Sequence, residues 1–288
     1  VLLRGMPGTG KTSTLGLAVR VLVARGEKLV VTSYTHSAVD NILRKLKEAG
    51  VESDVCCRLG ASSSVHEDVR EYCLDTSKYS TVGTMSTHLA QLRIICCTVL
   101  HAARDPLITR FQADMTVVDE AGQISQPAVI GALLNTRRFL LVGDDYQLPP
   151  LVVSRQAQRE GMDVSLFKRL SEAHPQAVMS LSEQYRMNRD IMYVCNTLIY
   201  GHRLSCGSPD VERAVLTLPD RSPLLQRTCL PWVAVALAPT QPVVFLDTDP
   251  IAEASSSSSS SSEGGLESGH VTGGGASSGN LVNILSCR

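Results

Sequence analysis

Gly5-Met6-Pro7-Gly8-Thr9-Gly10-Lys11-Thr12 is the stretch that decides the fold of this chain. It follows the apolar residues Val1–Leu3 and opens a segment with helical spacing that runs to about Arg25. The stretch matches GxxxxGK[ST], a loop whose backbone N–H groups surround the β- and γ-phosphates of a nucleotide. A helix N-terminus favours such anions. The alternative is a glycine turn before an ordinary helix. We expect Thr12 to ligate Mg²⁺ and the phosphates to be bound by Gly5, Gly8, Thr9, Gly10 and Lys11.

Strand and helix patterns alternate along the first part of the chain. This alternation predicts an α/β fold in which helices flank a parallel sheet. Apolar residues recur at helical spacing over Lys11–Arg25 and Ser37–Ala49, where we expect helices. Residues 61–81 are polar and irregular and predict a surface excursion. The expected strands are Val1–Arg4, Leu29–Thr32, Arg93–Thr98, Met115–Val118 and Phe139–Val142.

Two acidic residues stand at the end of one of these strands, in Val117-Val118-Asp119-Glu120. At the carboxyl end of a strand, Asp119 can hold magnesium through water, and Glu120 can polarise an attacking water. By itself, an acidic pair after an apolar run is more often a solvated turn. Downstream of a phosphate loop it is the expected partner of that loop.

A second strand-end motif is Gly143-Asp144-Asp145-Tyr146-Gln147-Leu148-Pro149-Pro150. Gln147 can reach a γ-phosphate, and the two prolines stiffen the chain beyond it. Such a loop can couple nucleotide hydrolysis to a second ligand. Considered alone, Pro-Pro is most often a connector.

The pattern changes after Tyr185. We predict a first domain over 1–183, the start of a second domain over 184–249, and a truncated continuation over 280–288. Within the second domain a helix is expected over Asn188–Tyr200 and a strand over Pro242–Thr248. Residues 250–279 are rich in serine and glycine, which predicts a flexible insertion. Because the chain opens inside a strand at Val1, we expect it to be a fragment.

The amino-acid composition excludes few classes of protein. The chain has 288 residues, 43% of them hydrophobic and 19% charged, which is ordinary for a globular protein. Its net charge of −1 gives no global sign of nucleic-acid binding, so such contacts must come from local loops. None of the nine cysteines forms a CxxC pair, which argues against a zinc or iron–sulfur site in this segment. We interpret the cysteines as buried apolar groups in a reduced compartment. No apolar run is long enough for a membrane span, and no signal peptide is apparent.

The motif order brings a family resemblance. GxxxxGKT, Asp119-Glu120-Ala121-Gly122-Gln123, the Gly143–Pro150 loop and Gln184-Tyr185-Arg186-Met187 resemble superfamily 1 helicases of the subgroup that moves 5′ to 3′ (subgroup B). Within that subgroup, Thr32–Leu43 is most similar to the eukaryotic DNA replication nuclease-helicases. The resemblance implies a RecA-like P-loop NTPase domain joined to the start of a second RecA-like domain.

The resemblance also implies site residues. Arg186 would meet the γ-phosphate from the domain boundary, and Tyr185 would stack on the adenine. Tyr185 as a plain core residue is the alternative. The residues placed where this family contacts a nucleic-acid strand are Ser33, Thr35, His36 and Thr98. For His36, a helix-capping or packing role is equally open.

Two positions depart from the family pattern. Asp145 stands where the family usually has His, which adds a carboxylate near the phosphates. Gly122 replaces a common Ser, which we expect to be a mild change. By the resemblance, a nuclease domain with a 4Fe–4S cluster would precede residue 1 in the parent protein, and nuclease activity would belong only there.

The resemblance implies ATP-dependent translocation on single-stranded DNA and duplex unwinding, in replication and repair in the nucleus. ATP and Mg²⁺ would be the cofactors, and a single-strand-binding protein a partner. One alternative is an RNA helicase of the same subgroup, as in nonsense-mediated decay or transcription termination. Another is an ATP-gated nucleic-acid-binding module that does not unwind.

Overall fold

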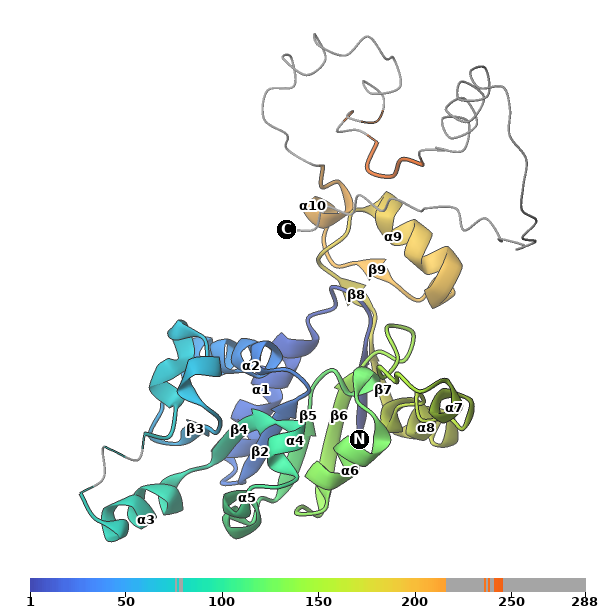
Figure 1. Ribbon diagram of the computed structural model, residues 1–288. Helices are drawn as coiled ribbons and strands as arrows, with labels where there is room; N and C mark the ends of the chain where they lie inside the picture. The colour runs from blue at the N-terminus through green and yellow to red at the C-terminus, as the bar shows by residue number, and fades with distance from the viewer. Residues whose placement is uncertain (76, 78–79, 216–235, 237, 239–240, 246–288) are drawn as a thin grey trace, which may run out of the picture.

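The computed structural model describes residues 1–75, 77, 80–215, 236, 238 and 241–245. Up to Leu181 these residues form a large α/β unit, and from Glu183 onward they form a smaller second unit (Figure 1). The predicted 250–279 insertion and the 280–288 segment lie outside the described residues. Of the predicted strand Pro242–Thr248, only 242–245 are described, and they are not a strand.

The sheet in the described part of the large unit has seven strands, all paired in parallel, in the order β3-β4-β2-β5-β6-β1-β7. Short strands with apolar residues on both faces suit such a sheet, because helices cover both sides of it. The strands are β1 Leu2–Gly5, β2 Leu29–Ser33, β3 Cys56–Arg58, β4 Ile94–Thr98, β5 Met115–Val118, β6 Arg138–Gly143 and β7 Val178–Leu181.

Helices cover the two faces of the sheet (Figure 1). The buried residues of α1 and α2 pack on one face, and those of α4, α5, α6 and α8 on the other. The helices of this unit are α1 Lys11–Ala24, α2 His36–Glu48, α3 Val82–Gln91, α4 Val99–Ala102, α5 Pro106–Phe111, α6 Gln126–Leu133, α7 Arg155–Arg159 and α8 Leu166–Ala173. Short 3₁₀ turns are η1 Ser62–Ser64, η2 Glu67–Tyr72, η4 Ala121–Gln123 and η5 Pro175–Ala177.

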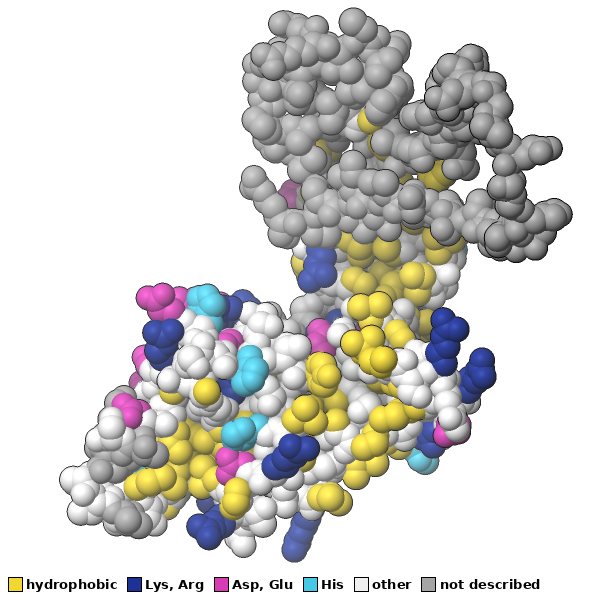
Figure 2. All heavy atoms as spheres, viewed as in Figure 1, with side chains coloured by type: hydrophobic (Ala, Val, Ile, Leu, Met, Phe, Trp, Pro, Cys, Tyr) yellow, Lys and Arg dark blue, Asp and Glu magenta, His cyan; other side chains and the backbone are white. Residues whose placement is uncertain are grey.

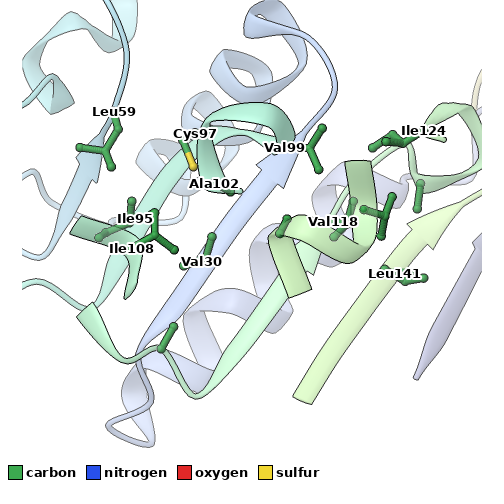
Figure 3. Close-up of a cluster of buried hydrophobic side chains, with 14 of the residues drawn as sticks. Val30, Leu59, Ile95, Cys97, Val99, Ala102, Ile108, Val118, Ile124 and Leu141 are labelled. Carbon is green, nitrogen blue, oxygen red and sulfur yellow. The ribbon is translucent and has the colours of Figure 1, made fainter. Parts of the chain in front are cut away.

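The strands supply alternate side chains to two apolar cores, since successive residues of a strand point to opposite faces. Val30 and Ile95 belong to the core shown in Figure 3, whereas their neighbours Val31 and Ile94 belong to the other. The adjacent pairs Cys56-Cys57 and Cys96-Cys97 divide between the two cores in the same way and are buried as free thiols. Burial raises the pKa of Cys97 to about 12, so this thiol stays protonated and acts as a small apolar group.

The predicted α/β class is confirmed, and the five strands predicted for the first domain appear to within one residue of their expected bounds. The prediction that residues 61–81 form a surface excursion is wrong in part. Val65, Val69 and Tyr72 are buried and close one edge of the second core, and the Tyr72 hydroxyl donates to the Val51 carbonyl at 2.6 Å. Among the described residues, no helix combines the length and apolarity that crossing a membrane requires.

The second unit is built on two short parallel strands, β8 Glu183–Gln184 and β9 Ser205–Cys206. The expected helix begins at its Asn188 cap as α9 Arg189–Cys195 and ends as a π-helical turn, η6 Asn196–Tyr200. A short helix, α10 Pro209–Glu212, follows β9. A third apolar cluster joins this unit to the phosphate loop, and its buried members are Met6, Met187, Tyr200 and Leu204. The division into two domains remains a prediction.

Candidate nucleotide-binding site and neighbouring cavity

The stretch Gly5–Thr12 links β1 to α1 at the carboxyl edge of the sheet. Gly8 and Gly10 adopt φ angles of 75° and 76°, a left-handed conformation that glycine adopts without steric cost. Thr9 closes the turn, because its hydroxyl donates to the Met6 carbonyl at 2.7 Å. Lys11 Nζ donates to the Gly5 carbonyl at 2.8 Å, which places the lysine across the loop.

A cleft of about 360 Å³ lies over this loop. Three separate parts of the chain line it: the loop and the start of α1, the residue after Asp119, and the first turn of the second unit. Its lining residues are Gly8, Thr9, Gly10, Lys11, Thr12, Ser13, Glu120, Tyr185 and Arg186. The structure therefore brings most of the predicted nucleotide-site residues together in one place.

Asp119 lies directly after β5, next to Thr12 and Glu120 of the cleft lining. It is 3% exposed, accepts from the Glu120 amide at 2.9 Å and lies 3.5 Å from the Thr12 hydroxyl. Burial, followed by the neighbouring Glu120 charge, raises the pKa of Asp119 to about 6. A carboxylate and a hydroxyl side by side beneath a phosphate loop are hard oxygen ligands, which fit Mg²⁺. Thr12 and Asp119 are thus the residues that could hold the metal.

The raised pKa of Asp119 makes a prediction about stability. Between about pH 4 and pH 6 the folded chain binds this proton more tightly than the unfolded chain, so the free energy of unfolding falls as pH rises through that window. Asp119→Asn removes the carboxyl group that has to lose its proton inside the fold. It should therefore raise the free energy of unfolding of the metal-free chain by roughly 1–3 kcal/mol at pH 7.5. Urea titrations at pH 7.5 and pH 4 test this. An equal change at both pH values would contradict it.

Glu120 follows in a left-handed conformation, with φ 53° and ψ 35°, which is uncommon for a residue other than glycine. This conformation turns the chain out of the sheet and places Glu120 in the cleft wall. Strained backbone of this kind concentrates at functional sites. The role of Glu120 as the residue that polarises the attacking water stays a prediction.

Arg186 reaches the cleft through a turn that Gln184 holds. The buried Gln184 amide oxygen accepts from the Arg186 and Met187 amides at 2.8 and 2.7 Å. The Tyr185 amide donates to the Gly8 carbonyl at 2.9 Å, so the second unit contacts the phosphate loop directly. Tyr185 is 57% exposed, which places it in the cleft wall and not in the core.

The tight contact between Gly8 and Arg186 yields a second prediction. A Cβ on Gly8 would lie 2.5 Å from the Arg186 Cβ, whereas one on Gly10 would meet nothing within 4 Å. Both glycines have a similar positive φ, so Gly8→Ala and Gly10→Ala share the same backbone strain. Because Gly8→Ala alone must displace Arg186, it should lower kcat at least about 10-fold more than Gly10→Ala. Equal losses in a phosphate-release assay would contradict this.

Gln147 does not line the cleft. Its side-chain amide donates to Asp144 Oδ2 at 2.8 Å, and the Tyr200 hydroxyl donates to the same oxygen at 2.9 Å. Asp144 is 2% exposed and its other oxygen accepts from the Tyr146 amide at 3.0 Å. The proposed γ-phosphate contact of Gln147 therefore stays a prediction, and this geometry instead links the loop to the second unit.

Asp145 was expected to place a carboxylate near the phosphates, but it pairs with an arginine instead. It forms a two-pronged ion pair with Arg4, at 2.7 and 2.9 Å, in which both side chains are largely buried. The added carboxylate is thus neutralised inside the sheet edge and is not among the residues of the cleft. The Arg4 guanidinium also lies 5.7 Å from the centre of the Tyr146 ring.

A larger cavity, of about 780 Å³, opens at the ends of β2, β3 and β4. His36 and Thr98, two of the predicted nucleic-acid residues, line it. Thr35 caps α2, because its hydroxyl accepts from the Ala38 amide at 3.2 Å. Ser33 is fully buried and donates to the Asp119 carbonyl at 3.1 Å, so it does not line this cavity, and its contact with a nucleic-acid strand stays a prediction.

Sequence reasoning missed three basic residues of this cavity, namely Arg58, His101 and Arg104. His101 Nε2 lies 2.7 Å from Asp105 Oδ2, one turn further along the chain. Arg58 could have been noticed, because a charged residue directly follows two cysteines in an apolar run. His101 and Arg104 carry no comparable signal, since the short α4 was not expected.

A parallel sheet with a phosphate loop, an acidic strand end and an arginine from an adjoining unit defines a RecA-like P-loop NTPase. Two family models, each described as an AAA domain, match the chain: one over residues 1–82 and 76–155, the other over residues 162–271. The chain therefore belongs to the AAA-domain family, among the superfamily 1 helicases that the motif order predicted.

Curated relatives agree with this placement. The chain is 48% identical over 248 residues to the DNA replication ATP-dependent helicase/nuclease JHS1 of Arabidopsis thaliana, covering 86% of the chain and 18% of the relative. It is 45% identical over 260 residues to the DNA replication ATP-dependent helicase/nuclease DNA2 of Mus musculus, covering 87% and 24%. The chain thus spans less than a quarter of the length of these relatives. An Arterivirus nonstructural protein 10 helicase solved with DNA aligns at a TM-score of 0.45 and 18% identity, covering 72% of this chain and 41% of that one.

Proposed function

We propose that this chain is the ATP-binding motor part of an ATP-dependent DNA helicase that moves 5′ to 3′ on single-stranded DNA and unwinds duplex. The observation that carries the proposal is the cleft, in which the phosphate loop of one unit faces Arg186 of the next. A site shared between two units can change their relative position as its occupant changes, which is what a motor needs.

The residues in and beside the cleft have the following roles in this proposal. The loop amides and Lys11 bind the phosphates, and Thr12 with Asp119 holds Mg²⁺, which neutralises charge on the phosphates. Glu120 orients the attacking water and accepts its proton. Arg186 neutralises charge that develops on the γ-phosphate, and Tyr185 stacks on the adenine.

The names of the relatives support DNA over RNA as the strand, because they are called DNA replication helicase/nucleases. On that basis we also propose work in the nucleus, a role in repair and a single-strand-binding protein as partner. A nuclease centre and a 4Fe–4S cluster would belong to the part of the relatives' length that this chain does not span.

Strand binding and ATP turnover, measured together, test the proposed function. A labelled single-stranded DNA and an RNA of the same sequence are titrated with the 288-residue chain, with and without Mg·ATP, and phosphate release is followed. We expect the DNA to bind more tightly and to stimulate turnover. Preference for the RNA would support the RNA helicase instead. Strand binding that responds to ATP without any turnover would support an ATP-gated binding module.

A further inference from the structure

A buried ion pair lies behind the larger cavity. Arg58, at the end of β3, is 0% exposed and donates through Nε to Asp40 of α2 at 3.1 Å. The second Asp40 oxygen accepts from the His66 amide at 2.9 Å, and Arg58 Nη1 donates to the Leu59 carbonyl. Both charged groups are therefore satisfied by partners, as burial requires. The hydrogen bonds to Asp40 and Leu59 hold the Arg58 guanidinium in place.

Arg58 has one further contact, and it is with His36. Arg58 Nη2 lies 3.0 Å from His36 Nδ1. A guanidinium has donors and no acceptor, so Nδ1 must be the acceptor in this bond. An imidazole that accepts at Nδ1 is neutral and carries its proton on Nε2. The protonation pattern of His36 thus follows from its partner.

The rest of the His36 side chain faces outward. His36 is exposed, and it lines the cavity together with Thr98, Ser64 and Arg104. Figure 2 shows histidine side chains spread over this face, over α2 and beside α4, with both basic and acidic side chains close by. The cavity lies at the carboxyl ends of β2, β3 and β4, in the same sheet whose β1, β5 and β6 ends carry the phosphate-loop, Asp119 and Asp144 motifs.

We propose that Arg58, anchored by Asp40, is a positioning residue that fixes His36 as a neutral Nε2–H donor to a phosphate oxygen of a bound nucleic-acid strand. This inference rests on the proposed strand-binding function of the same face. The ion pair between Arg58 and Asp40 then serves to position His36. Buried ion pairs contribute little net stability relative to apolar residues of similar size, so stability alone does not account for this one.

A neutral hydrogen-bond donor and a cation differ in how their contribution to DNA affinity depends on salt. Each cationic side chain that neutralises a phosphate of a single strand adds about 0.7 to the slope of log affinity against log salt, because counterions are released. A neutral donor adds a hydrogen bond and releases none. His36 should therefore contribute affinity but no salt dependence.

The first experiment reads the tautomer directly. Two-bond ¹H–¹⁵N correlation spectra of the full 288-residue chain at pH 7.5 should show His36 with its proton on Nε2 alone. Arg58→Lys keeps a positive charge for Asp40 but lacks the planar fork that reaches both partners. In this variant His36 should show a mixture of tautomers, while circular dichroism confirms that the chain is folded. A mixture in the unaltered chain would overturn the positioning role.

The second experiment measures single-stranded DNA affinity by fluorescence anisotropy over a range of salt. His36→Ala and Arg58→Lys should each weaken binding roughly 3- to 10-fold, the effect of one lost hydrogen bond, with an unchanged salt slope. His66→Ala is the matched control, because this exposed histidine does not line the cavity and its amide remains for Asp40. Unchanged affinity in His36→Ala, or a slope smaller by about 0.7, would overturn the proposal.

The two experiments distinguish a failure of the Arg58 positioning role from a failure of the proposed strand-binding function. If the unaltered chain binds no single-stranded DNA, the strand-binding function fails, and the phosphate contact of His36 fails with it. If the chain binds DNA but His36 shows mixed tautomers, only the role of Arg58 fails.

Discussion

Replacing Lys11 with alanine is expected to abolish ATP turnover and to weaken Mg·ATP binding more than about 100-fold. Lys11 lines the cleft and spans the loop to the Gly5 carbonyl, so its ammonium already lies across the loop whose amides would surround a phosphate. Removing it leaves several negative charges with fewer compensating donors in a narrow space. The cost is large because such charges are poorly tolerated without partners.

The test combines calorimetric titration of Mg·ATP with phosphate release in a form of the protein that turns over ATP. Lys45→Ala is a suitable control, since Lys45 lies on α2, pairs with Glu48 and does not line the cleft. The control should behave like the unaltered protein. Turnover that survives Lys11→Ala would refute the assignment of the site.

Arg186→Ala should lower kcat on the order of 10³-fold while leaving the affinity for Mg·ATP within about threefold. The reason is that charge on the γ-phosphate grows in the transition state, and a residue contributed by the adjoining unit acts mainly there. Gln184 holds the turn through backbone amides, so truncating the Arg186 side chain leaves that turn in place.

Arg189→Ala provides the control for this variant. Arg189 is exposed, pairs with Asp190 and Glu212, and does not line the cleft, so its loss should leave kcat unchanged. Steady-state kinetics separate kcat from KM. An effect of Arg186→Ala on KM alone would contradict a transition-state role.

The sheet and the cleft could be predicted because their sequence signals are local. A phosphate loop needs glycines at fixed spacing, and strands buried on both faces appear as short apolar runs. These signals located β1, β2, β4, β5 and β6 and led to the residues that now line one cleft. Edge strand β7 was missed because Val178–Leu181 is largely exposed and short, with a serine among its four residues.

The partners of polar side chains could not be predicted, because they come from distant parts of the chain. Asp145 was expected near phosphates, but Arg4, 141 residues away, pairs with it. Ser33 stands beside a surface turn in sequence, yet it is buried where β2 pairs between β4 and β5. Gly122 looked like a mild change, but a Cβ there would lie 2.5 Å from the Asp144 carbonyl oxygen. The surroundings of each of these residues depend on the order of the strands in the sheet, which local sequence patterns do not predict.

The bond from the Tyr185 amide to the Gly8 carbonyl joins the two units through main-chain atoms alone. No exchange of side chain at position 185 removes it, except proline, which lacks the N–H. Alanine at position 185 would therefore leave this bond intact and would not report its contribution. The position of Arg186 beside the loop thus depends on a main-chain bond as well as on the Gln184 side chain and on the space that Gly8 leaves.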